Sequence, residues 1–165
     1  MKTILVIAML FAAVLSTSLP EGEYKISCKV DQNNVLDIEK AVNDNGANLI
    51  VYGWHTGNNQ RFYLNYVEGE WATLVAKHSN KALTVTGNTE GAVYQQYDNI
   101  ESPQQLFKIQ LTSDKYYLIK NKATGLVLNC NADAKSEINN RLAVQEGRDC
   151  SDAQKLTFTR LDVPN

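Results

Sequence analysis

The chain has 165 residues and a formal net charge of −2 at pH 7, with 16 Lys and Arg residues against 18 Asp and Glu residues. A single domain of this length buries a sizeable core without help from a metal ion or a partner subunit. Basic residues are scattered singly along the chain. This pattern excludes the phosphate backbone of a nucleic acid as a natural partner.

The first 18 residues have the layout of a secretory signal peptide. Lys2 precedes an apolar run of twelve residues from Ile4 to Leu15, and small hydroxyl residues lead to Ser18. As a helix, this run rises only about 18 Å, which is short of the roughly 30 Å hydrocarbon core of a bilayer. We therefore expect cleavage after Ser18 and a secreted, extracellular domain over residues 19–165 that does not insert into membranes.

Three cysteines follow this segment, and an oxidising compartment favours pairing two of them. Cys130 and Cys150 are twenty residues apart, so we expect a Cys130–Cys150 disulfide that contributes roughly 3 kcal/mol on the chain-entropy model. Cys28 alternates with polar residues and shares a predicted strand face with Ile26 and Val30. This placement favours a buried structural thiol over a reactive one.

The remainder of the chain contains the same unit three times. One apolar pattern recurs at a spacing of about 45 residues: VLDIEK at 35–40, ALTVTG at 82–87 and LVLNCN at 126–131. A glutamine follows each segment, at Gln60, Gln105 and Gln154, and we expect its side chain to pin a turn. The repeats are placed at about 22–68, 69–114 and 115–162.

Each unit reads as short strands. Tyr24, Ile26 and Cys28 alternate with polar neighbours at a period of two, and turn-forming segments such as DQNN and NDNG separate these stretches. About four strands fit in each unit, so the prediction is an all-β protein, a β-trefoil of three four-stranded repeats with pseudo-threefold symmetry. It would be a six-stranded barrel closed at one end by three hairpins. The expected core residues are Leu36, Leu83, Leu128, Phe62, Phe107 and Leu156 or Phe158.

A string in the first unit points to a family. The dipeptide LD at 36–37, followed by NGANLIVYGWHTGNNQRF, resembles the ricin B-like lectin repeat and is closest in pattern to single-domain fungal lectins of that family. The resemblance extends over all three units. It implies one shallow galactose- or N-acetylgalactosamine-type site per intact unit, made in the first unit by Asp37, Tyr52 and Asn59.

The other two units depart from the family pattern at these positions. The second unit keeps an aromatic residue, Tyr97, but has Thr84 and Gln104 in place of Asp and Asn. In the third unit all three positions differ: Asn129, Glu146 and Ala153. The resemblance therefore implies one intact site and two decayed ones.

Trp54 and His55 complete the candidate carbohydrate-binding site. Either Tyr52 or Trp54 supplies the ring that stacks on the sugar, and His55 is either a ligand contact or a turn residue that bonds the backbone. A carboxylate accepts charge-assisted hydrogen bonds from two hydroxyls, a ring covers the C–H face, and Asn both donates and accepts. We expect Asp37 to face solvent, so that Asp37→Ala changes stability by less than about 1 kcal/mol.

The residues do not favour an enzyme. His55 and His78 fall in different units, no HExxH or GxSxG pattern occurs, and we expect no cofactor and no metal site. The expected partners are glycans on glycoproteins or glycolipids, and a homodimer would raise avidity. The alternative is a trefoil protease inhibitor or receptor-binding factor that acts through loops such as 98–104 and 131–141.

Overall fold

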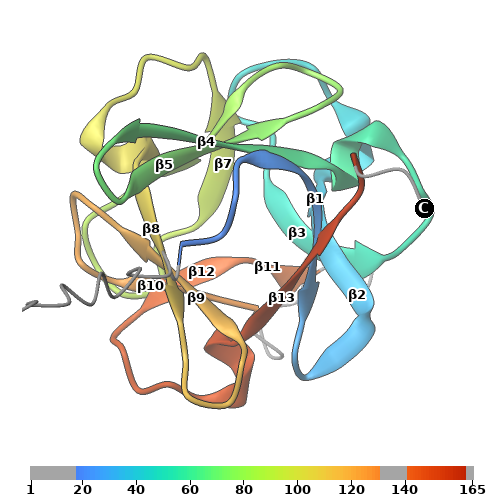
Figure 1. Cartoon of the computed structure of the whole chain (residues 1–165). Coiled ribbons are helices and arrows are strands. Elements are labelled where there is room, and N and C mark those ends of the chain that lie inside the picture. The colour runs from blue at the N-terminus through green and yellow to red at the C-terminus, as the bar shows by residue number, and fades with distance from the viewer. Residues whose placement is uncertain (1–17, 131–140, 163–165) are drawn as a thin grey trace, which may run out of the picture.

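The computed structural model describes residues 18–130 and 141–162, and β-strands dominate this part of the chain (Figure 1). The predicted signal peptide lies outside the described residues except for Ser18, as does loop 131–141 except for Arg141. The helices of the described residues are single 3₁₀ turns, and none of them has the length and apolar character needed to cross a bilayer.

The strands divide in chain order among the three units. The first unit contains β1 (Gly22–Cys28), β2 (Asp31–Ile38), β3 (Leu49–Gly53) and β4 (Phe62–Glu68). The second contains β5 (Trp71–Ala76), β6 (Ala82–Val85), β7 (Tyr94–Tyr97) and β8 (Phe107–Leu111). The third contains β9 (Tyr117–Asn121), β10 (Val127–Asn129), β11 (Arg141–Leu142), β12 (Val144–Glu146) and β13 (Leu156–Arg160). The 3₁₀ turns are η1 (Glu39–Ala41), η2 (Asn58–Gln60), η3 (Pro103–Gln105) and η4 (Asp152–Gln154).

The third strand of the third unit is divided at Ala143 into β11 and β12. The Ala143 amide donates to the carbonyl of Leu49, and the Ala143 carbonyl accepts from the amide of Tyr94. The chain therefore pairs with β3 before this residue and with β10 after it. This exchange of partners at the middle of the molecule accounts for a thirteenth strand where the repeat predicts twelve.

Six strands close into a barrel. Antiparallel pairing runs from β1 to β4, β5, β8, β9 and β13, and β13 pairs back with β1. The hairpins β2–β3, β6–β7 and β10–β12 cover one end. Closure leaves the barrel strands without an open edge, which a single unit could not achieve. The predicted β-trefoil is confirmed.

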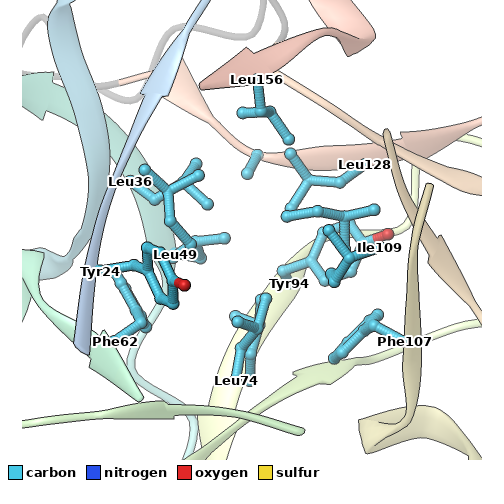
Figure 2. Packing of buried hydrophobic residues seen from close by; sticks show 14 of the residues in the cluster. Tyr24, Leu36, Leu49, Phe62, Leu74, Tyr94, Phe107, Ile109, Leu128 and Leu156 are labelled. Carbon is cyan, nitrogen blue, oxygen red and sulfur yellow. The ribbon is translucent and has the colours of Figure 1, made fainter. Parts of the chain in front are cut away.

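The core lies inside the barrel and beneath the hairpins (Figure 2). The predicted core residues are confirmed as buried: Leu36, Leu83, Leu128, Phe62, Phe107 and Leu156, with Phe158 partly buried against them. Val30, which the alternation placed on the same face as Cys28, is exposed because β1 ends at Cys28 and the chain turns into β2. Period-two alternation is informative only as far as the strand extends.

The predicted Cys130–Cys150 disulfide is wrong. Cys28 is bonded to Cys130, with a Cα–Cα distance of 6.3 Å, and Cys150 is a free, partly exposed thiol. Cys28 ends β1 and Cys130 follows β10, and both side chains are buried in the one core. Barrel closure brings the first and third units together, so residues 102 positions apart become neighbours.

Candidate functional site

Each unit carries a loop that is closed by its repeated glutamine. In the first unit, Gln60 Oε1 accepts the amide hydrogen of His55 at 2.8 Å, and Gln60 Nε2 donates to the carbonyl of Gly53 at 2.8 Å. The other units repeat this clamp: Gln105 accepts from Ile100 and donates to Asp98, and Gln154 accepts from Cys150 and donates to Gly147. All three glutamines are buried. Their predicted role as structural pins of the turns is confirmed.

In the first unit this loop folds over Asp37. The carboxylate oxygen Oδ1 accepts from Asn59 Nδ2 at 2.9 Å. The other oxygen, Oδ2, accepts from Gln60 Nε2 at 2.7 Å and pairs with His55 Nε2 at 3.2 Å. Asp37 is only 2% exposed, so the expectation of a solvent-facing side chain is wrong. Asp37 does point to the opposite side of β2 from Leu36, but the clamped loop covers that side.

Burial is the strongest influence on the Asp37 carboxyl group and raises its pKa above the ordinary value, because a charged group loses hydration there. The hydrogen bond from Gln60, the charge and hydrogen bond of His55 and the hydrogen bond from Asn59 act in the opposite direction. The carboxylate is therefore held by directed donors in place of water.

Asn59 is mainly engaged inside the protein. Its Nδ2 group donates both to Asp37 Oδ1 and to the carbonyl of Ile38, at 3.0 Å. Both amide hydrogens are therefore used, and Oδ1 is the remaining acceptor. A Cβ atom at Gly57 would lie 2.6 Å from this Oδ1 and 2.6 Å from His55 Cε1, so any larger residue here requires these side chains to shift.

The two candidate rings have different surroundings. Tyr52 is 46% exposed, and its ring meets that of His55 edge to face, with 6.0 Å between centroids. The Trp54 ring is instead covered by cations, with Lys25 Nζ 5.2 Å and Arg61 Cζ 6.0 Å from its centroid. The structure thus brings Tyr52 and His55 together beside Asp37 and engages Trp54 with the neighbouring basic side chains.

The equivalent positions of the second unit have neutral side chains. Thr84 Oγ1 accepts from Gln105 Nε2 at 3.1 Å, as Asp37 does from Gln60. A pocket of about 510 Å³ lies here, and its lining includes Thr84, Tyr97, Ile100 and Gln104. The position of the first unit's carboxylate is thus taken by a neutral hydroxyl.

In the third unit, Asn129 Nδ2 donates to Glu146 Oε2 at 2.5 Å. The Glu146 carboxylate therefore accepts one amide hydrogen of Asn129 where the first unit has Asp37 and Tyr52. Among the described residues, no group of three or more His, Cys, Asp or Glu side chains is placed to hold a metal ion. His78, in the second unit, lies 3.0 Å through Nε2 from the carbonyl of Val42, as expected for a turn residue.

The closed barrel and its three hairpins define the class of protein, a β-trefoil. The chain belongs to the ricin-type β-trefoil lectin domain-like family, whose model matches residues 11–97. Membership of this family supports carbohydrate binding.

Solved structures share the fold. The designed threefold-symmetric protein ThreeFoil is 28% identical, with a TM-score of 0.78 over 85% of this chain and 99% of its own. The Rhizoctonia solani agglutinin is 21% identical, with a TM-score of 0.76 over 87% of this chain and 98% of its own. The Polyporus squamosus lectin, solved with the epitope Neu5Aca2-6Galb1-4GlcNAc, is 17% identical, with a TM-score of 0.72 over 88% of this chain and 51% of its own.

Among curated proteins, flavastacin of Elizabethkingia meningoseptica is 32% identical over 80 residues, which is 48% of this chain. The match spans only 18% of the length of flavastacin. It thus concerns one part of a much longer protein.

Proposed function

We propose that this chain is a secreted lectin without catalytic activity, which binds galactose- or N-acetylgalactosamine-type glycans through the first-unit site. The observation that carries the proposal is the Asp37 carboxylate held beside Asn59 and the exposed ring of Tyr52. At the position of Asp37 the other units have Thr84 and Asn129, so the first unit alone offers an acidic acceptor there.

The geometry suits a ligand that donates hydrogen bonds. Asp37 Oδ1 accepts one hydrogen bond from Asn59 and retains one acceptor position, for which a sugar hydroxyl group can supply the hydrogen. The Tyr52 ring offers an apolar surface for the C–H face of a hexose. A site that offers one carboxylate position and one exposed ring supports a dissociation constant between about 10 μM and 1 mM, so strong attachment requires a dimer or a polyvalent glycan surface.

A glycan array with the protein over residues 19–165 tests the proposal, and Tyr52→Ala is the most informative variant. Tyr52 is exposed, so its loss removes the ring without disturbing the core. Tyr97→Ala is the matched control, because Tyr97 is the equivalent residue of the second unit and is 37% exposed. We expect the array signal for galactose-type glycans to fall at least about ten-fold in Tyr52→Ala and to persist in Tyr97→Ala.

A protein that binds no glycan on the array, or that loses nothing in Tyr52→Ala, would remove the first-unit site. Inhibition of a protease by the same preparation would then favour the alternative, a trefoil that acts through its loops. Ile100, which is 75% exposed in the loop 98–104, would be the first residue to substitute in that case.

A further inference from the structure

The carboxylate of Asp37 has little capacity left for a ligand. An ionised carboxylate offers about two acceptor positions on each oxygen. Oδ2 already receives hydrogen bonds from Gln60 and His55, and Oδ1 receives one from Asn59. Counting donors in the described part of the chain, Oδ2 is filled and Oδ1 has one position available. The expectation that Asp37 grips a pair of hydroxyls does not fit this arrangement.

A second contact of His55 assigns the tautomer of its neutral ring. The amide N–H of Gly57 donates to His55 Nδ1 at 3.3 Å, so Nδ1 bears a lone pair. The neutral ring then carries its hydrogen on Nε2 and donates it to Asp37 Oδ2, 3.2 Å away. His55 is therefore bound at both ring nitrogens in a single orientation, with its ring against that of Tyr52.

The three donors to Asp37 differ in their freedom. Gln60 and Asn59 are buried, and each holds a second hydrogen bond to a backbone carbonyl. The side chain of His55 is 46% exposed. Gln60 and Asn59 are thus permanent parts of the loop, whereas the histidine ring lies over the carboxylate from the solvent side and decides how much of it a ligand can reach.

The same clamped loop forms in all three units, although the side chain at the position of His55 differs between them. The residues at the equivalent position are Ile100 and Asp149. The backbone amide of each donates a hydrogen bond to the clamping glutamine of its own unit, as in the first unit. The loop therefore forms with imidazole, aliphatic or carboxylate side chains. An imidazole at this position is not needed for the fold, which leaves it free to serve recognition.

We propose that His55 is the specificity-determining residue of the first-unit site: it occupies Asp37 Oδ2, so that the carboxylate accepts one sugar hydroxyl through Oδ1 and not a neighbouring pair. This inference rests on the proposed lectin function. It predicts that a single ring hydroxyl dominates recognition, while the adjacent hydroxyl contributes little. Removal of the imidazole exposes Oδ2 and converts the site to recognition of two hydroxyls.

The test is a deoxygenation scan by isothermal titration calorimetry. The probe is the methyl glycoside that binds best among galactose, N-acetylgalactosamine, glucose and mannose, together with its monodeoxy derivatives. For two neighbouring hydroxyl groups of the sugar, we expect removal of one to lower the affinity for the parent protein at least about ten-fold. Removal of the other should lower it less than about three-fold. In His55→Ala, both derivatives should lose at least about ten-fold.

His78→Ala is the control, because it removes the other histidine of the chain, which bonds the carbonyl of Val42 and not Asp37. It should keep the parent's pattern. A parent protein that already needs both hydroxyls, or a His55→Ala pattern identical to the parent's, would overturn the inference while leaving the lectin function standing. Absence of binding to all four glycosides would remove the lectin function itself, so the two failures are distinguishable.

Discussion

Asp37 anchors the loop above it, and the proposed glycan would bind the same carboxylate. Asp37→Ala leaves one hydrogen of Gln60 and one of Asn59 without their acceptor in a buried site. We expect the free energy of unfolding to fall by about 1–3 kcal/mol, because buried donors lose their partners. Urea denaturation followed by tryptophan fluorescence measures this change.

The matched comparison for this substitution is Asp37→Asn. It retains an acceptor oxygen for one donor and no longer buries a charge, whose cost is evident in the raised pKa of Asp37. We expect Asp37→Asn to destabilise less than Asp37→Ala. Equal stability of the parent and Asp37→Ala would show that the cluster contributes nothing to the fold.

At the scale of single residues, the sequence identified the members of this cluster but not their environment. The LD dipeptide and the Asn-Gln pair located Asp37 and Asn59, and alternation placed Asp37 opposite the core-facing Leu36. Whether an outward strand residue meets water depends on what folds over it. That cover is a loop held by Gln60 through contacts that strand periodicity does not encode.

The loop that contains η2 depends on one glycine. A Cβ atom at Gly57 would approach Asn59 Oδ1 and His55 Cε1 to 2.6 Å, and both of these side chains are held by Asp37. We expect Gly57→Ala to lower the free energy of unfolding by about 1–3 kcal/mol and to weaken glycan binding, because the crowded side chains must leave Asp37.

Gly53→Ala is the matched control, since a Cβ atom at Gly53 would meet no atom within 4 Å. Denaturation curves and glycan titrations of the two variants side by side measure the difference. If Gly57→Ala matched Gly53→Ala in both measurements, the described packing of the loop would be incorrect.

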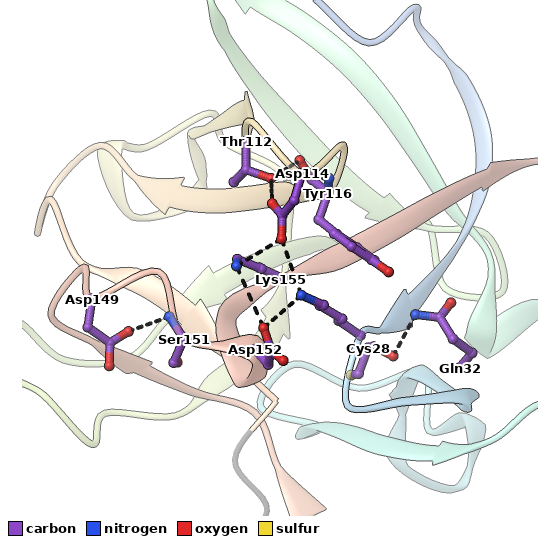
Figure 3. Close-up of polar contacts among 10 residues, drawn as sticks. Cys28, Gln32, Thr112, Asp114, Tyr116, Asp149, Ser151, Asp152 and Lys155 are labelled. Atoms are coloured by element: carbon purple, nitrogen blue, oxygen red, sulfur yellow. Dashed lines mark hydrogen bonds and ion pairs between the residues drawn. The ribbon is translucent and has the colours of Figure 1, made fainter.

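Turns from all three units meet in one ionic network (Figure 3). Lys29 Nζ lies 3.2 Å from Asp114 and 2.8 Å from Asp152, and Lys155 Nζ lies 3.0 Å from Asp114. Hydrogen bonds lower the pKa of Asp114 well below its ordinary range. The bond from Thr112 has the largest effect, and those from Lys155 and Lys29 add to it. The hydrogen bond from Lys29 lowers the pKa of Asp152.

These lowered pKa values determine how the stability of the fold changes as pH falls. A carboxyl group with a lower pKa in the folded state stabilises the fold above its ordinary pKa, near 3.8, and this contribution is lost as pH falls through the folded value. We expect the urea midpoint to decrease between about pH 5 and pH 2, and to decrease less in Asp114→Asn. An acid response that Asp114→Asn leaves unchanged would contradict the network's role.

The architecture of the whole molecule was predictable because it repeats. Three copies of one apolar pattern, each with period-two alternation, permit few folds other than a trefoil, and core residues such as Leu36 and Leu128 followed from that pattern. Contacts between units were not predictable in the same way. Which cysteine meets which depends on barrel closure between β1 and β13, and the twenty-residue spacing of Cys130 and Cys150 carries no information about that closure.

The Cys28–Cys130 disulfide connects the first and third units across 102 residues, so its loss should weaken the closure of the barrel. Cross-links that close loops of this length restrict the unfolded chain strongly, and we expect the double variant Cys28→Ala, Cys130→Ala to lose about 3–5 kcal/mol in urea denaturation.

Cys150→Ser should change stability by less than about 1 kcal/mol, because Cys150 is partly exposed and its backbone amide bonds Gln154 whatever the side chain. Peptide mapping without reduction should recover Cys28 linked to Cys130 and a free thiol at Cys150. A recovered Cys130–Cys150 link, or a larger loss of stability in Cys150→Ser than in the double variant, would refute the pairing.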